Sequence, residues 1–260
     1  DGLVALGGGS AIDTAKAVSS ETGLPIVSIP TTYSGAEWTQ GFGMRDSATG
    51  IKRGGGGART VAVVYDPSLT LGLPPAESAG SAMNALAHCA EALYVSGRTE
   101  DTDVVALDGA KLISDWLPVV VERGDDLEAR RQLLEGAMYA GFALRVGMGL
   151  GHAMAQALGG RYGLAHGTMN AVCLPLALRY NRDVAAAGIA RFGEAMGHGD
   201  AISRVNELGA LAGPPRLRDY DVPWEDLETL SDAIAERAPA KANPRPAPPE
   251  AIRELLEEIW

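Results

Sequence analysis

The sequence has few cysteines, no long apolar run and a shortage of positive charge. Cys89 and Cys173 are the two cysteines among 260 residues, and they form no CxxC spacing, which predicts reduced, buried thiols in a cytoplasmic protein. No apolar run approaches the roughly 20 residues that a helix needs to cross a bilayer, so no membrane partner is expected. The net charge of −11 repels phosphate backbones, so nucleic acid is not expected either. A small anionic substrate fits this charge only if local arginines or lysines bind it.

The front of the chain alternates short apolar runs with turns rich in glycine and hydroxyl groups. The run 3–6 ends in GGGS at 7–10, and a predicted helix follows over 11–20. Strand, glycine turn and helix form a unit whose backbone N–H groups can hold a phosphate, although an ordinary tight turn has the same pattern. A second apolar run, 25–30, leads into TTYSG at 31–35, where open α/β sheets bind ligands. These runs predict an α/β front quarter.

Residues 51–60, IKRGGGGART, are glycine-rich and cationic. Lys52, Arg53 and Arg59 could bind a cofactor phosphate or a substrate carboxylate, and a plain hairpin is the alternative. A third apolar run, 60–65, follows and ends at an Asp-Pro pair.

The sequence pattern changes from short apolar runs to a helical pattern after the two prolines at 74 and 75. From there on, alanine and leucine recur at helical spacing. Asp101, Asp126 and Asp200 are predicted helix N-caps, and Pro175 is expected to kink or break its helix. The predicted domains are therefore an α/β domain over 1–73 and an all-helical domain over 74–260. The chain begins without Met directly in a strand-like segment, so we expect an N-terminal portion to precede it. The predicted helices span 78–94, 101–117, 126–144, 151–158, 168–181, 184–196, 201–211, 224–238 and 249–259.

Three of the four histidines occupy positions typical of a functional site. Asn84 and His88 are four residues apart and share a face of a predicted helix, and His152 and Gln156 repeat that spacing on another. His166 is flanked by glycines. A single pair of this kind could also be an ordinary buried histidine that is hydrogen-bonded to an amide, with no function. The recurrence favours convergence of all five side chains in one cleft.

Several motifs together resemble the iron-containing alcohol dehydrogenase family, and most closely its maleylacetate reductase branch. They are GGGSAIDTAK, PTTYSGAE, KRGGGGART, VVYDPSLTLGLP, SAMNALAHCAEALY, GHAMAQALGGRYGLAHGTMNAVCLP and a late NPRP, in that order along the chain. The resemblance implies a Rossmann-like NADH- or NADPH-binding domain, a helical domain and an active site between them, in a homodimer. By resemblance the cofactor-binding residues are Gly8, Gly9, Ser10, Asp13, Thr31, Thr32 and Ser34.

The departures from the family pattern concern the metal. His88, His152 and His166 match three metal ligands of the alcohol dehydrogenase branch, but Asn84 stands where that branch has an aspartate, and Gln156 where it has a further histidine. A neutral amide is a weak ligand for a divalent cation. Three histidines alone can still hold zinc. The maleylacetate reductase branch shares this asparagine and is described as metal-free, so we expect no metal.

The resemblance implies reduction of the C=C bond of maleylacetate to 3-oxoadipate, in the catabolism of aromatic compounds. Negative charge would develop on the ketone oxygen, and His152 or His166 could stabilise it and supply the proton. The two substrate carboxylates require cations, for which Arg161, Lys52, Arg53 and Arg145 are the candidates, with Arg161 first.

Three other functions were weighed. A metal-dependent alcohol dehydrogenase acting on a simple alcohol or aldehyde is the main alternative, and Asn84 and Gln156 argue against it. A lyase like dehydroquinate synthase should carry more basic residues around its helical domain. A module without enzymatic activity would not bind nucleotide.

Overall fold

The computed structural model describes residues 1–45 and 52–260, with backbone alone at 44, 45, 52 and 53. Its front part holds a parallel sheet in the order β1-β2-β5, in which Leu3 of β1 aligns with Ile26 of β2. The elements of this part are β1 (Leu3–Gly7), α1 (Gly9–Thr22), β2 (Ile26–Pro30), η1 (Ala36–Trp38), the antiparallel pair β3 (Phe42–Arg45) and β4 (Lys52–Gly55), β5 (Thr60–Val63) and η2 (Pro67–Thr70).

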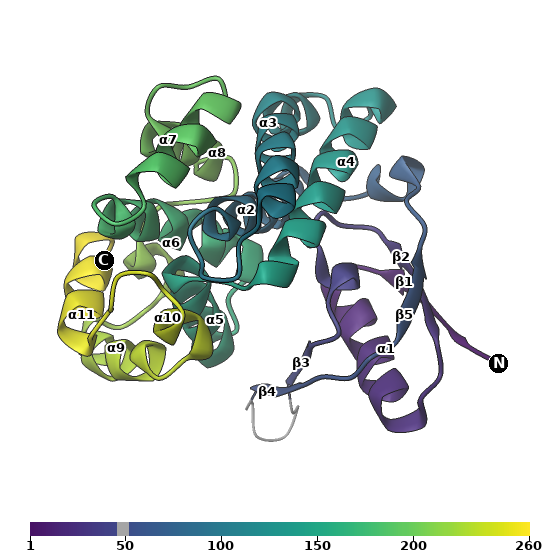
Figure 1. The fold of residues 1–260 in the computed structure, drawn as a ribbon, viewed down its shortest axis with the longest axis horizontal. Helices are drawn as coiled ribbons and strands as arrows, with labels where there is room; N and C mark the ends of the chain where they lie inside the picture. The colour runs from purple at the N-terminus through teal and green to yellow at the C-terminus, as the bar shows by residue number, and fades with distance from the viewer. Residues whose placement is uncertain (46–51) are drawn as a thin grey trace.

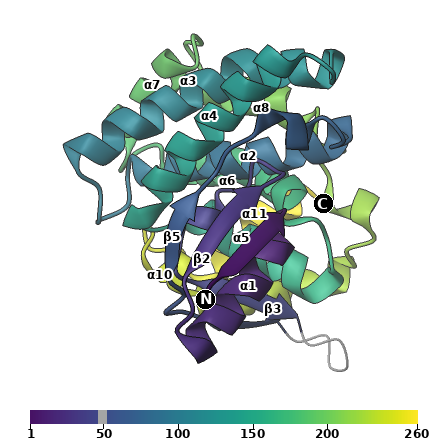
Figure 2. The same ribbon diagram turned by 90° about the vertical axis from the view of Figure 1, so that its right-hand side faces the viewer.

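Helix α1 covers one face of the sheet. Ala5 and Ile26 of the strands form a small core with Ile12 of α1, whereas Val4 and Leu6 are exposed on the other face. In Figure 1 the sheet and α1 form one end of the molecule, and the helices form the other. Figure 2 looks onto the sheet end, with the helical part behind it.

The rest of the chain is helical, and no strand lies among residues 64–260, all of which are described. The predicted fold class, an α/β part followed by an all-helical part, is confirmed. The helices are α2 (Pro75–Ala92), α3 (Glu100–Glu122), α4 (Leu127–Ala143), η3 (Leu144–Val146), α5 (Leu150–Tyr162), α6 (His166–Asn181), α7 (Ala186–Ala195), α8 (Ala201–Gly209), η4 (Leu217–Tyr220), η5 (Trp224–Asp226), α9 (Leu227–Ala235), α10 (Ala238–Lys241) and α11 (Pro249–Glu258).

Helix boundaries follow local capping chemistry. The side chains of Asp126 and Asp200 accept hydrogen bonds from backbone N–H groups of the first turn, as predicted. The prediction for Asp101 is wrong, because Thr99 caps α3 through a capping box with Thr102. Helix α6 continues through Pro175, so the expected break is absent.

Helix α2 is the central element of the helical part, and α3, α4 and α6 pack against it. It is buried along nearly its whole length because its small alanines and Gly80 allow its neighbours to approach on every side. Its polar residues Asn84, His88 and Glu91 are therefore buried as well. A polar stripe inside an apolar helix must find its hydrogen-bond partners on other elements.

Candidate active site

A cavity of about 880 Å³ lies between the front part and the helices. Gly9, Ser10, Asp13, Thr32 and Ser34 line it on the front side. On the helical side its wall includes Asn84, His88, Gln156, His166, Thr168 and Arg237. The structure thus brings the predicted cofactor turn and most of the predicted catalytic residues to one space.

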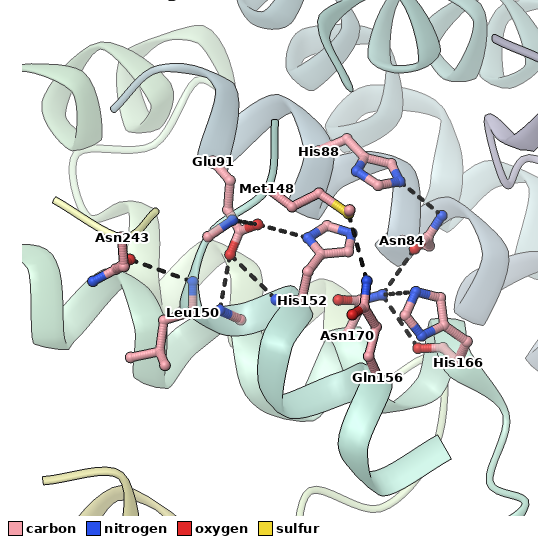
Figure 3. A network of polar contacts seen from close by, with 12 residues as sticks. Asn84, His88, Glu91, Met148, Leu150, His152, Gln156, His166, Asn170 and Asn243 are labelled. Atoms are coloured by element: carbon pink, nitrogen blue, oxygen red, sulfur yellow. Dashed lines mark hydrogen bonds and ion pairs between the residues drawn. The ribbon is translucent and has the colours of Figure 1, made fainter. Parts of the chain in front are cut away.

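Three imidazole rings gather at this helical wall (Figure 3). His88 on α2 stacks on His152 of α5, with ring centroids 4.1 Å apart and planes inclined by 16°. His166, the first residue of α6, lies 5.9 Å from His152 between centroids. His152 is fully buried and is not among the cavity-lining residues, so it supports the wall from behind.

Asn84 determines the protonation of His88. Its Nδ2 donates to the carbonyl oxygen of Ser34 at 2.7 Å, so this atom must be the amide nitrogen. The same Nδ2 lies 3.2 Å from His88 Nε2, which must then accept and carry no proton. Burial, followed by the neighbouring imidazoles, lowers the pKa of His88 well below its ordinary value. His88 is therefore neutral, with its proton on Nδ1.

Asn170 continues this network to the third ring. Its Nδ2 donates to Asn84 Oδ1 at 2.8 Å and lies 3.1 Å from His166 Nε2. Because Nδ2 is a donor, His166 Nε2 accepts, and the proton of the neutral ring lies on Nδ1. Two amides thus fix the tautomers of two imidazoles. Asn170 was not predicted, although it lies four residues after His166 on the same face of α6.

Glu91 is a second residue that the sequence interpretation missed. One of its carboxylate oxygens, Oε2, accepts from His152 Nδ1 at 2.7 Å and from Gly149 N at 2.6 Å. The other, Oε1, accepts from Gly151 N at 2.8 Å and His152 N at 3.3 Å. The carboxylate thereby caps the N-terminus of α5, where the helix dipole favours negative charge. A Cβ at Gly151 would lie 3.0 Å from Oε1, so glycine lets the carboxylate approach.

Asn243, from the proline-rich segment, supports the same helix end. Its Oδ1 accepts from Leu150 N at 3.3 Å, and it exchanges two hydrogen bonds with Asn181 at 2.9 and 2.8 Å. The N-terminus of α5, and with it His152, is held from two sides.

Two ring nitrogens of the cluster have no partner. His88 Nδ1 and His152 Nε2 are buried and make no hydrogen bond in the described part of the chain. Buried polar atoms rarely stay unsatisfied, and those that do are often functional. Among the described residues, Gln156 Nε2 on the cavity wall has one hydrogen-bond partner, the weak acceptor Sδ of Met148 at 3.7 Å.

The front side of the cavity has the form of a phosphate cradle. Helix α1 starts at Gly9, and no side chain in the described part of the chain caps this helix end; its first two residues, Gly9 and Ser10, line the cavity. A Cβ at Gly8 would lie 2.9 Å from Thr32 Cγ2, so glycine allows the two predicted cofactor turns to approach. Asp13 accepts from Gly43 N at 3.0 Å and from Lys16 at 3.4 Å, which ties α1 to β3. Thr31 and Gly8 are not among the lining residues.

The structure does not bring Arg161 or Arg145, two of the predicted substrate-binding residues, to the cavity. Arg161 pairs with Asp226 at 2.9 Å, and the guanidinium of Arg145 lies 5.4 Å from the ring centroid of Phe142; neither lines the cavity. The side chains of Lys52 and Arg53 lie outside what the structure describes. Arg237, which does line the cavity, was not predicted.

The chain is similar to known proteins both in sequence and in fold. Residues 1–67 match the model of the iron-containing alcohol dehydrogenases, and residues 78–260 match that of the C-terminal part of the Fe-containing alcohol dehydrogenase family. The chain belongs to the iron-containing alcohol dehydrogenase family. It is an oxidoreductase, as these matches and its relatives indicate.

The relatives include characterised reductases. The maleylacetate reductase of Burkholderia cepacia is 39% identical, over 100% of this chain and 74% of its own length. The crystal structure of a maleylacetate reductase from Agrobacterium tumefaciens is similar with a TM-score of 0.91 at 35% identity, covering 100% of this chain and 74% of that one. A sulfoacetaldehyde reductase from Bifidobacterium kashiwanohense, solved in complex with NAD⁺, is similar with a TM-score of 0.88 at 25% identity, covering 99% and 76%.

The family description names iron, so the fit of the three histidines to a metal ion can be tested. A metal shared by two imidazoles lies near both ring planes, because the nitrogen lone pairs are in plane. The stacked planes of His88 and His152 meet only far from both rings. Asn84 turns amide hydrogens toward His88 Nε2, and its oxygen is bonded to Asn170. This donor set does not fit a divalent cation, and no group of three or more His, Cys, Asp or Glu among the described residues is arranged to hold one.

Proposed function

We propose that this protein reduces the C=C bond of maleylacetate to 3-oxoadipate with NADH or NADPH. The observation that carries the proposal is the single cavity that joins an open helix N-terminus to a wall of imidazoles and amides. The identity of 34–39% to maleylacetate reductases along the whole chain supports it.

The front side of the cavity would hold the cofactor. The N–H groups at the start of α1 would bind its pyrophosphate, with Gly9 and Ser10 at the turn and Thr32 and Ser34 opposite. When bound, the cofactor supplies the hydride that adds to the alkene carbon two bonds from the ketone. Asn84 donates a hydrogen bond to the carbonyl oxygen of Ser34, so the loop that carries Ser34 is held at a fixed position relative to the imidazole wall.

The helical side of the cavity would receive the negative charge. Addition of hydride turns the ketone oxygen into an enolate oxygen, and the amide of Gln156 is placed on the wall to donate to it. A proton from solvent, delivered through His166 on the same wall, would pass to the carbon next to the ketone, which completes 3-oxoadipate. Neutral His88, on the same wall, and the Glu91–His152 pair behind it would hold these groups in place. This assigns the acid role to His166 rather than to His152.

The reduction would proceed without a metal ion. Hydrogen bonds from neutral donors replace a Lewis acid in this proposal, and the amide of Asn84 takes the place of an anionic ligand. We also propose, from the resemblance, that the enzyme is a cytoplasmic homodimer; buried, unpaired Cys89 and Cys173 are compatible with a reducing compartment.

The test is the oxidation of NADH and of NADPH by the purified protein, with maleylacetate and with a panel of simple aldehydes. We expect turnover of maleylacetate that survives exhaustive chelation, with metal content far below one ion per chain. Turnover of aldehydes alone would refute the proposal. Stoichiometric iron or zinc with chelator-sensitive activity would refute its metal-free part and favour the alcohol dehydrogenase alternative.

A further inference from the structure

Arg237 is the only cationic side chain among the cavity-lining residues that the structure describes. It lies in the turn between α9 and α10, where it is the N-cap residue of α10. Both helices pack against α5, which carries His152 and Gln156. The turn therefore carries a positive charge to the same wall as the imidazoles.

The guanidinium of Arg237 has no counter-ion among the described residues. Its Nε is buried without a hydrogen-bond partner, and no Asp or Glu in the described ranges forms an ion pair with it. Burial lowers the pKa of Arg237 from its ordinary value. Arg161, by contrast, lies 2.9 Å from Asp226. A partly buried charge without an acceptor is unfavourable, and an anionic ligand would remove that penalty.

Helix α5 shows how far Arg237 lies from the groups that would contact the substrate ketone. His152, Gln156 and Gly160 recur every four residues and lie along one face of that helix. A Cβ at Gly160 would be 3.9 Å from Arg237 Nη2, so the guanidinium lies beside Gly160. With a rise of about 1.5 Å per residue, Gly160 is about 6 Å beyond Gln156 along the axis. The charge is thus one helical turn away from the groups that would contact the ketone.

We propose that Arg237 binds a terminal carboxylate of the substrate and selects dicarboxylates over neutral carbonyl compounds. This inference rests on the proposed function. A six-carbon dicarboxylate whose alkene and ketone lie against Gln156 and His166 can extend along α5 and place its end at Arg237. The planar guanidinium then binds both carboxylate oxygens, a geometry that lysine does not reproduce.

The test compares Arg237→Gln, Arg237→Lys and two controls in steady-state kinetics with maleylacetate. Arg237→Gln should raise KM about 30- to 100-fold and change kcat by less than about 3-fold, because a charge-assisted bond to a remote carboxylate contributes to binding. Arg237→Lys should recover part of the loss. Lys241→Gln removes the same charge from α10 at an exposed ion pair with Glu236 and should match the wild type. Arg161→Gln tests the other candidate arginine and should also match it.

A second measurement does not depend on turnover. Adipate, an unreactive six-carbon dicarboxylate, is titrated calorimetrically into each protein in the presence of NAD⁺. The wild type should bind adipate, and Arg237→Gln should lose this binding while its melting temperature stays at or above that of the wild type.

The outcomes separate the two proposals. If the wild type reduces maleylacetate and Arg237→Gln keeps its KM within about 2-fold, the role of Arg237 is refuted and the proposed function stands. If the wild type does not reduce maleylacetate, the proposed function is refuted and the titration decides alone. Adipate binding lost in Arg237→Gln then supports a carboxylate site, whereas retained binding, or none in the wild type, overturns it.

Discussion

Glu91 on α2 accepts a hydrogen bond from His152 on α5 at 2.7 Å, with both side chains fully buried. The same carboxylate caps α5, so one group sets both the start of that helix and the orientation of the ring. Its removal should therefore affect stability and catalysis together.

Glu91→Gln keeps the shape of the side chain but replaces one acceptor oxygen with an NH₂ group. That group faces backbone N–H groups or His152 Nδ1, all of which are donors. At least one hydrogen bond is therefore replaced by a repulsive contact between two donors. We expect a loss of about 2–3 kcal/mol in unfolding free energy and a fall of about 10- to 100-fold in kcat. Urea denaturation and steady-state kinetics check this. Glu91→Gln with wild-type kcat would show that His152 needs no anionic partner.

Gly151→Ala tests the close approach of the carboxylate to α5. The added Cβ would lie 3.0 Å from Glu91 Oε1 and 3.3 Å from Ala177 Cβ, so it must displace one of them. We expect a lower melting temperature and a lower kcat. Gly160→Ala, on the same helix, meets no atom closer than 3.9 Å and should raise the melting temperature, since alanine favours the helix by up to about 1 kcal/mol. Equal effects of both substitutions would contradict the argument.

Asn84→Asp tests the metal-free arrangement. The amide nitrogen of Asn84 donates to Ser34 O and His88 Nε2, and a carboxylate at this position can donate to neither. In the presence of a chelator we expect a loss of about 1–3 kcal/mol in stability and most of the activity. Added Zn²⁺ should raise the melting temperature of this variant more than that of the wild type. Unchanged stability in chelator would show that the amide hydrogens are not needed.

Acid should destabilise the protein through His88. Its pKa is lowered in the folded state, so the unfolded chain binds the proton first as the pH falls through 6.5, the ordinary value. The free energy of unfolding should therefore not depend on His88 above that pH. Below it, the free energy of unfolding should fall by up to about 1.4 kcal/mol per pH unit. Denaturation midpoints between pH 7.5 and 5 measure this slope. His88→Asn should flatten the slope, and an unchanged slope in this variant would contradict the prediction.

The sequence was most informative where partners are close along the chain. The four-residue spacings of Asn84 with His88 and of His152 with Gln156 indicated shared helix faces, and the structure places these side chains in one cluster. The glycine turn at 7–10 indicated the start of α1 because strand, turn and helix are local features.

Partners far apart in sequence were not found. Glu91 meets His152 across 61 residues, and nothing in α2 alone shows that its carboxylate caps another helix. Asn243 meets Leu150 across 93 residues in the same way. Arg237 was not predicted for a different reason. The pattern over 224–238 predicted one continuous helix, whereas the chain turns at Arg237, and this turn brings the side chain to the cavity. Arg161 was ranked first because it lies between His152 and His166 in the sequence. That position gave no sign that its guanidinium forms an ion pair with Asp226.

The hydrogen bond from Asn84 to the carbonyl of Ser34 is one of the contacts that join the front part of the molecule to the helices. As long as that carbonyl is in place, the amide can point its nitrogen in only one direction, and His88 must keep its proton on Nδ1. Without the Ser34 carbonyl, the hydrogen bond from Asn170 to Asn84 Oδ1 would be the remaining contact that orients the amide toward His88. The arrangement of protons in the imidazole cluster thus depends in part on the position of the loop that carries Ser34.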